Sequence, residues 1–283
     1  MDDLWFSEYH TPSVRLSIRV KSQLHHEKSE HQTISVFDSE EFGRFLALDG
    51  IMMLTEKDEF IYHEMIVHPA MAVFPETERV LVIGAGDGGV LRELTRYASV
   101  CSVDVAEIDG RVAQVCRRFL PQTACGFDDS RVSLHIQDGL KFVRCKENQY
   151  DLIIVDSTDP FGPGESLFTR EFYGNCFRAL TENGILINQH ESPFYCNDAE
   201  EAIRTHRHIS RVFPIAEVYQ AHIPTYPSGH WLFGFASKKF HPLVDLKADA
   251  WNALNLKTRY YNTDLHRGAF ALPNYVKELL NRE

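Results

Sequence analysis

Residues 79–89 read RVLVIGAGDGG, and this stretch carries the strongest signal of the fold. Its first part, RVLVIG, is a nearly continuous apolar run of the kind found in strands that are buried on both faces of a parallel sheet. The glycines that follow open a predicted helix over Gly88–Tyr97, and glycine at such a turn lets a ligand approach the backbone at a helix N-terminus. The spacing alone fits nicotinamide dinucleotides, ligands of the adenosylmethionine type, or a tight turn that binds nothing.

Strands and helices alternate downstream of this turn. The further predicted strands are Val100–Glu107, Val132–Ile136, Tyr150–Val155, Gly184–Gln189, Ala216–Ile223 and His230–Ala236, and the predicted helices are Gly110–Leu120, a short one from Gly139, Thr169–Thr181 and Asn197–Phe213. This alternation predicts an α/β fold with a Rossmann-like doubly wound sheet of the class I methyltransferase type, about seven strands wide.

The first part of the chain is rich in β-strand signals instead. Val14–Val20, Gln32–Asp38 and Arg44–Leu48 are predicted strands with polar turns between or after them, which indicates a small antiparallel β-domain. We therefore expect two domains, with residues 1–55 forming the β-domain and residues 56–283 forming the Rossmann-like domain.

A helix is expected to begin at Glu56, and Pro69 should kink or divide it. Its apolar residues can share one face, and they are Phe60, Ile61, Met65, Val67 and Met71. His63 and His68 do not form a zinc-protease motif, because they are five residues apart and not the four that place two histidines on one helix face.

Composition narrows the class of partner. The chain has 283 residues with 29 basic and 40 acidic side chains, a formal charge of −11. This charge argues against nucleic acid or an anionic membrane as the main partner and favours attraction of a small cation. The start, MDDLWFSEYH, does not resemble a signal peptide, and no stretch reaches the ~18 apolar residues of a membrane span, so we expect a cytoplasmic protein. The six cysteines lack a C-x-x-C pair and are expected to be reduced and mostly buried, and Trp5, Trp231 and Trp251 are expected in the core.

Carboxylates follow the predicted strands. Glu107 ends the second strand of the alternating part, 23 residues after Gly84, where it can accept hydrogen bonds from both hydroxyls of a ribose. Asp138, just before Gly139, is suited to an adenine amino group, although an aspartate at this place alone more often caps a helix. Binding of a nucleoside is therefore favoured over a turn without a ligand.

Asp156 and Asp159 lie just past a strand that is almost purely apolar. Two such carboxylates often cap a helix or bind a metal, but this pair lies at the sheet edge where ligands bind in doubly wound folds. The stretch behind them, through Phe168, contains glycines and prolines in a pattern typical of a gating loop. A metal is not expected, because the sequence shows no cluster of matching ligands.

Residues 9–273 resemble the spermidine synthases, a family of polyamine aminopropyltransferases. The matching stretches are HHEKSEHQ (25–32), LDG (48–50), DEFIYHEM (58–65), the Gly84–Arg92 loop, EID (107–109), Asp138-Gly139, Asp156–Phe168, IPTYPSG (223–229), and YYN (260–262) with His266 and AFALP (269–273). Each stretch is modest evidence, but together and in this order they are highly specific.

The resemblance implies a role for each matching residue. Asp156 matches the catalytic proton acceptor, and Tyr62 is expected to assist it. The positions that hold the donor, decarboxylated S-adenosylmethionine, are matched by Gln32, Asp87, Glu107, Asp138, Gly139 and Pro163, and Asp87 is the one that receives the aminopropyl amine. The positions that line the polyamine channel are matched by Tyr62, His63, Asp87, Asp156, Asp159, Gln189 and Tyr226.

The resemblance further implies that the donor is a co-substrate with no additional cofactor, and that the chain forms a homodimer or homotetramer through its N-terminal strands. Two features depart from the family's pattern. Ala85 replaces the usual middle glycine of the loop, which is harmless if its φ angle is negative. His190-Glu191 follows Gln189 where relatives vary, so the acceptor stays open between putrescine, our first choice, and cadaverine, agmatine or spermidine.

Three other functions share parts of this pattern. A class I methyltransferase would have a similar nucleoside pocket, but Asp87 would repel the extra carboxylate of intact adenosylmethionine. A nicotinamide-dependent dehydrogenase leaves Asp156–Phe168 and Tyr226 unexplained, and an idle polyamine sensor would not need an intact Asp156. Aminopropyl transfer accounts for all of these residues, because a diamine nitrogen must lose a proton to a carboxylate before it can attack the methylene beside a sulfonium.

Overall fold

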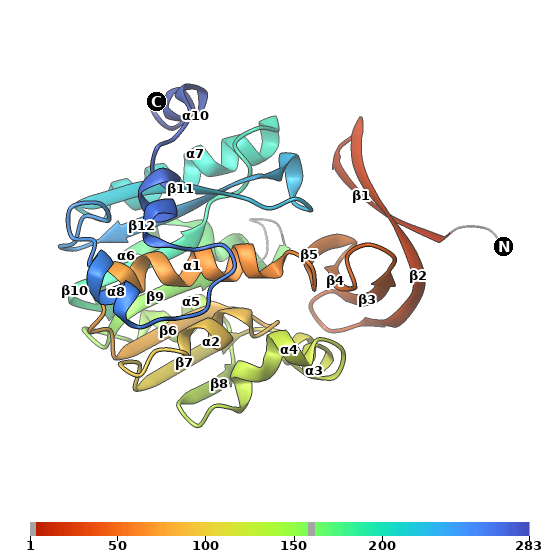
Figure 1. Ribbon diagram of the computed structural model, residues 1–283, viewed down its shortest axis with the longest axis horizontal. Coiled ribbons are helices and arrows are strands. Elements are labelled where there is room, and N and C mark those ends of the chain that lie inside the picture. The colour runs from red at the N-terminus through yellow and green to blue at the C-terminus, as the bar shows by residue number, and fades with distance from the viewer. Residues whose placement is uncertain (1–3, 158–161, 283) are drawn as a thin grey trace.

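The computed structural model describes residues 4–157 and 162–282, and within these ranges it contains two β-sheets. The first sheet is antiparallel, follows the order β1-β2-β3-β4-β5, and lies to one side of the main body in Figure 1. Its strands are β1 (Leu4–Thr11), β2 (Val14–Lys28), β3 (Thr33–Ser39), β4 (Arg44–Leu48) and β5 (Ile51–Thr55). The sequence predicted three of these strands, whereas β1, β5 and the second half of β2 were missed. The domain boundary after residue 55 stays a proposal.

The second sheet is mixed and follows the order β11-β12-β10-β9-β6-β7-β8. Strands β10, β9, β6, β7 and β8 pair in parallel, whereas β12 is antiparallel to both of its neighbours. The bounds are β6 (Arg79–Gly84), β7 (Ser102–Glu107), β8 (Val132–Ile136), β9 (Tyr150–Asp156), β10 (Leu180–Gln189), β11 (Ile215–His222) and β12 (His230–Ser237). The predicted α/β class and the Rossmann-like sheet of seven strands are confirmed.

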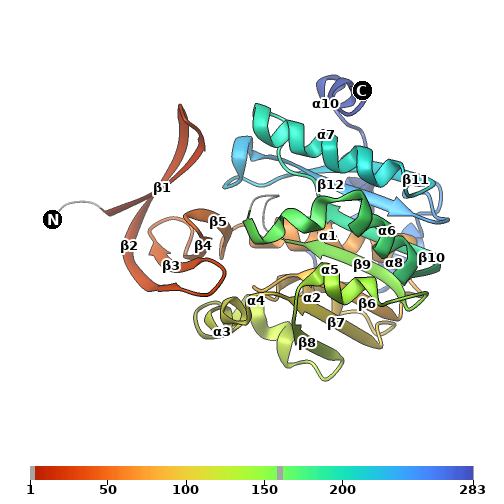
Figure 2. The same ribbon diagram turned by 180° about the vertical axis from the view of Figure 1, so that it is seen from behind.

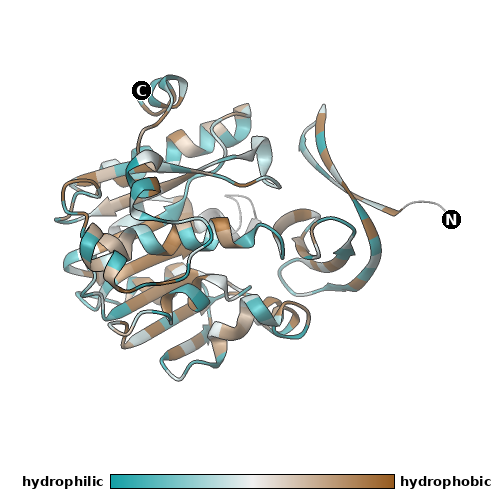
Figure 3. Cartoon of the chain, in the orientation of Figure 1, coloured by the Kyte–Doolittle hydropathy of each residue, from teal (hydrophilic) through white to brown (hydrophobic). Residues whose placement is uncertain are grey.

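Helices cover both faces of this sheet, as Figures 1 and 2 show from opposite sides. Within strand β6, Val80 and Val82 pack with α1, α2 and α3, whereas Leu81 and Ile83 pack with α5, α6 and α7. The apolar strands therefore form the centre of the molecule, as the colouring of Figure 3 also shows. The helix bounds are α1 (Glu59–Val73), α2 (Gly89–Leu94), α3 (Gly110–Phe119), α4 (Pro121–Ala124), α5 (Gly139–Arg144), α6 (Arg170–Ala179), α7 (Cys196–Ser210), α8 (Ala248–Ala253), α9 (Thr263–Ala269) and α10 (Asn274–Leu280), with 3₁₀ turns η1 (Cys125–Asp128), η2 (Gly162–Phe168) and η3 (Pro227–Gly229).

Helix α1 differs from the prediction because Pro69 does not divide it. Proline lacks the N–H that would bond the carbonyl four residues earlier, which here belongs to Met65. The Tyr219 hydroxyl donates a hydrogen bond of 2.7 Å to this carbonyl and replaces the missing partner. The helix is also buried all round from Ile61 to Val73, and not on one face only, because it lies between the sheet and the C-terminal segment.

The C-terminal segment is anchored to α1 through Glu64, the residue after His63. The Glu64 carboxylate is buried and accepts 2.8 Å hydrogen bonds from three successive backbone N–H groups, those of Arg259, Tyr260 and Tyr261. Hydrogen bonds to a charged acceptor stabilise a fold by about 1.5–3 kcal/mol each. This contact fixes the helix that carries His63 at the site.

Two expectations about burial were wrong. Trp5 on β1 is 54% exposed, whereas Trp231 and Trp251 are buried as predicted. Only Cys116 and Cys176 are buried, and the other four cysteines are exposed. Within the described ranges, every helix is too short or too polar to cross a bilayer.

Candidate active site

A cavity of about 340 Å³ lies where the carboxyl ends of the central strands meet the N-terminal sheet. The predicted site residues that line it are Gln32, Tyr62, His63, Asp87, Glu107, Asp138, Gly139, Asp156, Gln189 and Tyr226. Asp159 and the side chain of Pro163 lie outside the described residues. The structure therefore brings together in one cavity every predicted site residue whose side chain it describes.

The glycine loop forms one wall of the cavity because its backbone lies against β9. Gly84 has a φ of +86°, and a Cβ there would lie 2.0 Å from the carbonyl oxygen of Asp156. That carbonyl also accepts a 2.8 Å hydrogen bond from the Ala85 N–H. Gly89 is equally constrained, since a Cβ would lie within 2.4 Å of the His63 ring. These close contacts place the loop directly beside Asp156 and His63.

Ala85 does not have the negative φ angle that would make it a harmless replacement for glycine. Its φ is +59°, in the left-handed region, and its side chain is buried. An L-residue with a Cβ in this conformation costs roughly 1–2 kcal/mol relative to the right-handed region. The loop therefore keeps the backbone shape that glycine would give, at a cost in stability.

Glu107 and Gln32 both bond to Asp109 at the part of the cavity expected to bind a nucleoside. Glu107 accepts a 2.8 Å hydrogen bond from the Asp109 N–H, and burial raises the pKa of Glu107 to about 7, helped by the negative charge of Asp109. The Gln32 amide donates a 3.0 Å bond to the Asp109 carboxylate, which ties the N-terminal sheet to the end of β7.

Asp138 caps a helix, which is one of the two roles that the sequence left open, and it also lines the cavity. One carboxylate oxygen accepts bonds from the N–H groups of Leu140 (2.8 Å) and Lys141 (3.3 Å), so Asp138 caps α5. Asp138 also lines the cavity, and neighbouring Gly139 brings the backbone close to Ile83, where a Cβ would clash at 2.4 Å. Helix capping therefore positions this carboxylate at the sheet edge.

Asp156 ends β9 with its two oxygens in different surroundings. The Tyr62 hydroxyl donates a 2.6 Å bond to Oδ1, whereas Oδ2 is buried without a hydrogen-bond partner among the described residues. Burial and the charge of Asp87 raise the pKa of Asp156 to about 7, although the neighbouring His63 and Tyr62 act to lower it. Burial and the charge of Asp156 also raise the pKa of Tyr62 well above its usual value. Asp156 can therefore take up a proton near neutral pH.

His63 lies between two carboxylates. Its Nδ1 is 2.5 Å from Glu59 and its Nε2 is 3.2 Å from Asp87, which also accepts a 2.6 Å bond from the Gly89 N–H. Burial opposes the charge on the ring, but the two carboxylates raise the pKa of His63 to about 10. Burial likewise opposes ionisation of Asp87, yet the charge of His63 lowers the pKa of Asp87. The pair is therefore ionised, with Asp87 as the anion.

The structure also brings together a cluster that the sequence did not reveal as a possible metal site. Ligand atoms of His63, Asp87 and Asp156 lie within 4.8 Å of one another. A metal needs a neutral imidazole with a free nitrogen lone pair, whereas both ring nitrogens of His63 already contact carboxylates. The arrangement is better suited to an organic cation bound between Asp87 and Asp156.

The remaining wall comes from β10, η3 and the N-terminal sheet. The Gln189 amide donates a 2.7 Å bond to Glu191, and the Tyr226 hydroxyl donates a 2.6 Å bond to the Met53 carbonyl. Further acidic residues line the cavity that sequence reasoning did not assign to it, and they are Glu8, Asp58, Glu59, Glu191 and Asp198. Glu8 was missed because strand β1 was not predicted, although the aromatic residues Trp5, Phe6 and Tyr9 around it favour a strand.

The fold and this site together define an α/β protein with a carboxylate-lined cavity at the carboxyl ends of its central parallel strands. Two family models match the chain, the spermine/spermidine synthase domain over residues 59–248 and the spermidine synthase tetramerisation domain over residues 4–56. The chain therefore belongs to the spermine/spermidine synthase family and is a polyamine aminopropyltransferase.

Curated relatives and solved structures agree with this family. The polyamine aminopropyltransferase of Alkaliphilus oremlandii is 64% identical over 99% of both chains, and that of Clostridium beijerinckii is 63% identical over 99% of this chain and 98% of its own. A spermidine synthase solved in complex with the transition-state analogue AdoDATO superposes with a TM-score of 0.95 at 44% identity, covering 98% of this chain and 94% of that one. The spermidine synthase of Thermotoga maritima gives a TM-score of 0.92 at 42% identity with the same coverage.

Proposed function

We propose that this aminopropyltransferase uses decarboxylated S-adenosylmethionine as donor and putrescine as acceptor, and forms spermidine and 5'-methylthioadenosine. The observation that carries the proposal is the geometry of Asp156. One of its oxygens is held by Tyr62, the other has no hydrogen-bond partner among the described residues, and Asp156 lines the same cavity as Glu107 and Asp87. No additional cofactor is proposed, because the donor is consumed as a co-substrate.

The donor would lie across the glycine loop. Glu107 would accept hydrogen bonds from the ribose hydroxyls, and Gln32, Asp138, Gly139 and Pro163 would surround the rest of the nucleoside. Asp87 would bind the aminopropyl ammonium, which explains a preference for the decarboxylated donor over intact adenosylmethionine. The related spermidine synthase solved in complex with the transition-state analogue AdoDATO supports a reaction of this kind.

The acceptor nitrogen needs a base. An alkyl ammonium has a pKa of about 10, so putrescine must lose a proton before its nitrogen has a lone pair. Asp156 takes this proton, with Tyr62 holding its other oxygen. The new C–N bond forms as the C–S bond breaks, and sulfur keeps the electron pair in the neutral thioether product. Alignment of nitrogen and methylene can contribute ~7–11 kcal/mol to the rate acceleration.

The distal ammonium of the acceptor would lie among carboxylates. Asp159 matches a polyamine-binding position of the family, and Glu8, Glu191 and Asp198 line the cavity. His63, Gln189 and Tyr226 would complete the channel. One methylene is discriminated by only ~1–3 kcal/mol, so cadaverine, agmatine and spermidine are the competing acceptors.

A product assay tests the proposal. Release of 5'-methylthioadenosine is measured with decarboxylated or intact adenosylmethionine and with each of the four amines. We expect the highest kcat/KM with the decarboxylated donor and putrescine, and none with the intact donor. A higher kcat/KM with another amine would replace putrescine as the acceptor, and equal use of both donors would remove the role of Asp87.

We further propose a cytoplasmic homodimer or homotetramer assembled through the N-terminal sheet. This sheet matches the tetramerisation domain and exposes large apolar side chains, namely Leu4, Trp5, Tyr9 and Val14. Multi-angle light scattering gives the mass of the assembly. A monomer at micromolar concentration would contradict the proposal.

A further inference from the structure

A chain of charged side chains runs from the cavity into the interior beside α1. It begins with the contacts of His63 to Asp87 (3.2 Å) and to Glu59 (2.5 Å). Arg92 on α2 then holds both oxygens of Glu59 in a bidentate pair, at 2.8 and 2.9 Å. Arg92 does not line the cavity, and only 20% of its side chain is exposed.

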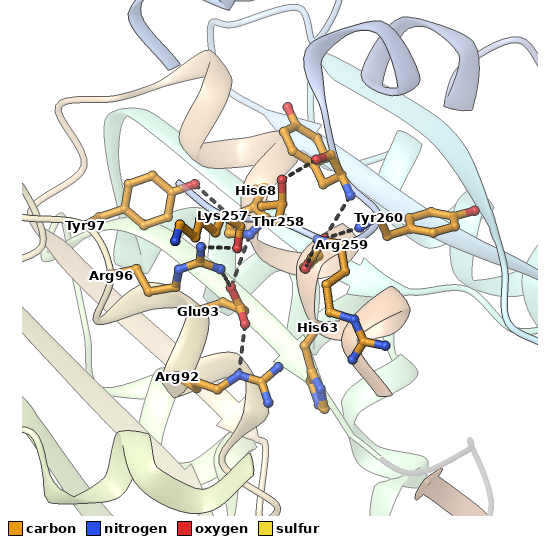
Figure 4. Close-up of polar contacts among 12 residues, drawn as sticks. His63, His68, Arg92, Glu93, Arg96, Tyr97, Lys257, Thr258, Arg259 and Tyr260 are labelled. Atoms are coloured by element: carbon orange, nitrogen blue, oxygen red, sulfur yellow. Dashed lines mark hydrogen bonds and ion pairs between the residues drawn. The ribbon is translucent and has the colours of Figure 1, made fainter. Parts of the chain in front are cut away.

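The chain continues to the second histidine of α1 (Figure 4). Arg92 Nε contacts Glu93 at 2.9 Å, and Glu93 lies 3.2 Å from His68, whose other ring nitrogen is 2.7 Å from the Tyr97 hydroxyl. Arg96 contacts Glu93 as well. The two histidines that failed as a zinc motif are therefore joined through α2, and Arg92 is the link between them.

Charge balance shows what Arg92 contributes. His63 faces Glu59 and Tyr62 on its own helix, Asp87 after β6, and Asp156 at the end of β9. Glu107 and Cys116 also interact electrostatically with Asp87. A single imidazolium thus stands between two buried carboxylates. Because Arg92 neutralises one of them, Glu59, the charge of His63 remains available to the other, Asp87.

We propose that Arg92 is a positioning residue for aminopropyl transfer. By clamping Glu59, it holds the His63 imidazolium on Asp87. Asp87 then remains an anion that receives the amine of the donor, and the proton taken from the acceptor goes to Asp156. This inference rests on the proposed roles of Asp87 and Asp156. The opposite pKa shifts of the two aspartates, lowered for Asp87 and raised for Asp156, agree with it.

The test compares two ligands that differ in the group Asp87 would bind. Arg92→Gln removes the positive charge that pairs with Glu59, so the His63 imidazolium is drawn toward Glu59 and no longer holds Asp87 in place. At pH 7 we expect the KM for decarboxylated S-adenosylmethionine to rise by about tenfold, since a small displacement of a binding group can cost up to ~10²-fold. The Kd of 5'-methylthioadenosine, which lacks the amine, should change less than about twofold.

Arg96→Gln is the matched control. It removes an arginine that contacts the same Glu93 but not Glu59, so it should lower the melting temperature without changing the donor KM. Arg92→Lys keeps the charge but loses the bidentate geometry, and a selective rise in donor KM of about threefold is expected. If Arg92→Gln does not fold, Arg92→Lys decides the question by the same two ligands.

Three results would overturn the inference. They are an unchanged donor KM in the folded Arg92 variants, an equal loss of donor and 5'-methylthioadenosine binding, and the same selective loss in Arg96→Gln. Failure of the proposed function can be told apart from failure of the inference about Arg92. If the proposed function is wrong, the unaltered enzyme releases no 5'-methylthioadenosine from the decarboxylated donor.

Discussion

Replacing Asp156 by asparagine tests the reaction most directly. Asp156→Asn keeps the size and shape of the side chain and can still accept the 2.6 Å bond from the Tyr62 hydroxyl. It removes the negative charge and the basicity that the proposed proton transfer requires. Because Oδ2 has no hydrogen-bond partner among the described residues, no protein contact is lost that would disturb the fold.

The size of the effect follows from the pKa of Asp156, which burial raises to about 7. About half of the unaltered enzyme then carries the ionised base at pH 7, so its rate lies within a factor of ~2 of the maximum. Loss of a general base lowers turnover by about 10²–10⁴-fold. We therefore expect kcat to fall at least ~100-fold, which corresponds to ~2.7 kcal/mol of transition-state free energy.

The assay measures kcat from release of 5'-methylthioadenosine with both substrates saturating, and calorimetry measures the Kd of that product. The Kd should stay within about twofold, because Gln32, Glu107 and Asp138 make their hydrogen bonds to residues other than Asp156. Tyr62→Phe is the companion variant, since it leaves the base in place and should cost less. A kcat of Asp156→Asn within about fivefold of the unaltered enzyme would refute the role of this carboxylate.

The remaining predictions concern pH and the backbone. kcat/KM should fall about tenfold per pH unit below pH 7, because burial raises the pKa of Asp156 to about 7 and only the ionised form accepts a proton. A kcat/KM that is independent of pH between 5 and 7 would contradict this prediction. Ala85→Gly should raise the free energy of unfolding by up to ~1 kcal/mol in denaturant titrations, since it relieves the strain of a φ of +59°. A loss of stability would show that packing of the Ala85 methyl group outweighs this strain. Tyr219→Phe should lower the free energy of unfolding by ~1–3 kcal/mol in the same titration, because the Met65 carbonyl beside Pro69 loses its hydrogen-bond donor. An unchanged midpoint would mean that this hydrogen bond does not stabilise α1.

Local patterns in the sequence predicted much of the fold. The run Arg79–Gly84 is apolar enough to require burial on both faces, and the alternation downstream leaves a doubly wound sheet as the natural arrangement. The residues after each parallel strand gather at one edge of that sheet, so the sequence was enough to predict that Asp87, Glu107, Asp138 and Asp156 lie together. The roles of Asp87 and Asp156 came from the family resemblance, and the roles of all four stay proposals.

The order of the amino acids was sufficient to assign each of these carboxylates to the end of a strand, because period and spacing are local properties that a chain carries whatever its partners are. Only tertiary contacts determine which groups share charge. Glu59 and Arg92 are 33 residues apart and meet because α1 packs on α2, and Pro69 stays inside a helix because Tyr219 arrives from β11. Burial and the charges of residues distant in sequence then set the pKa values of the two aspartates, and no local pattern contains this information. They keep Asp87 an anion and make Asp156 the carboxylate that can take a proton.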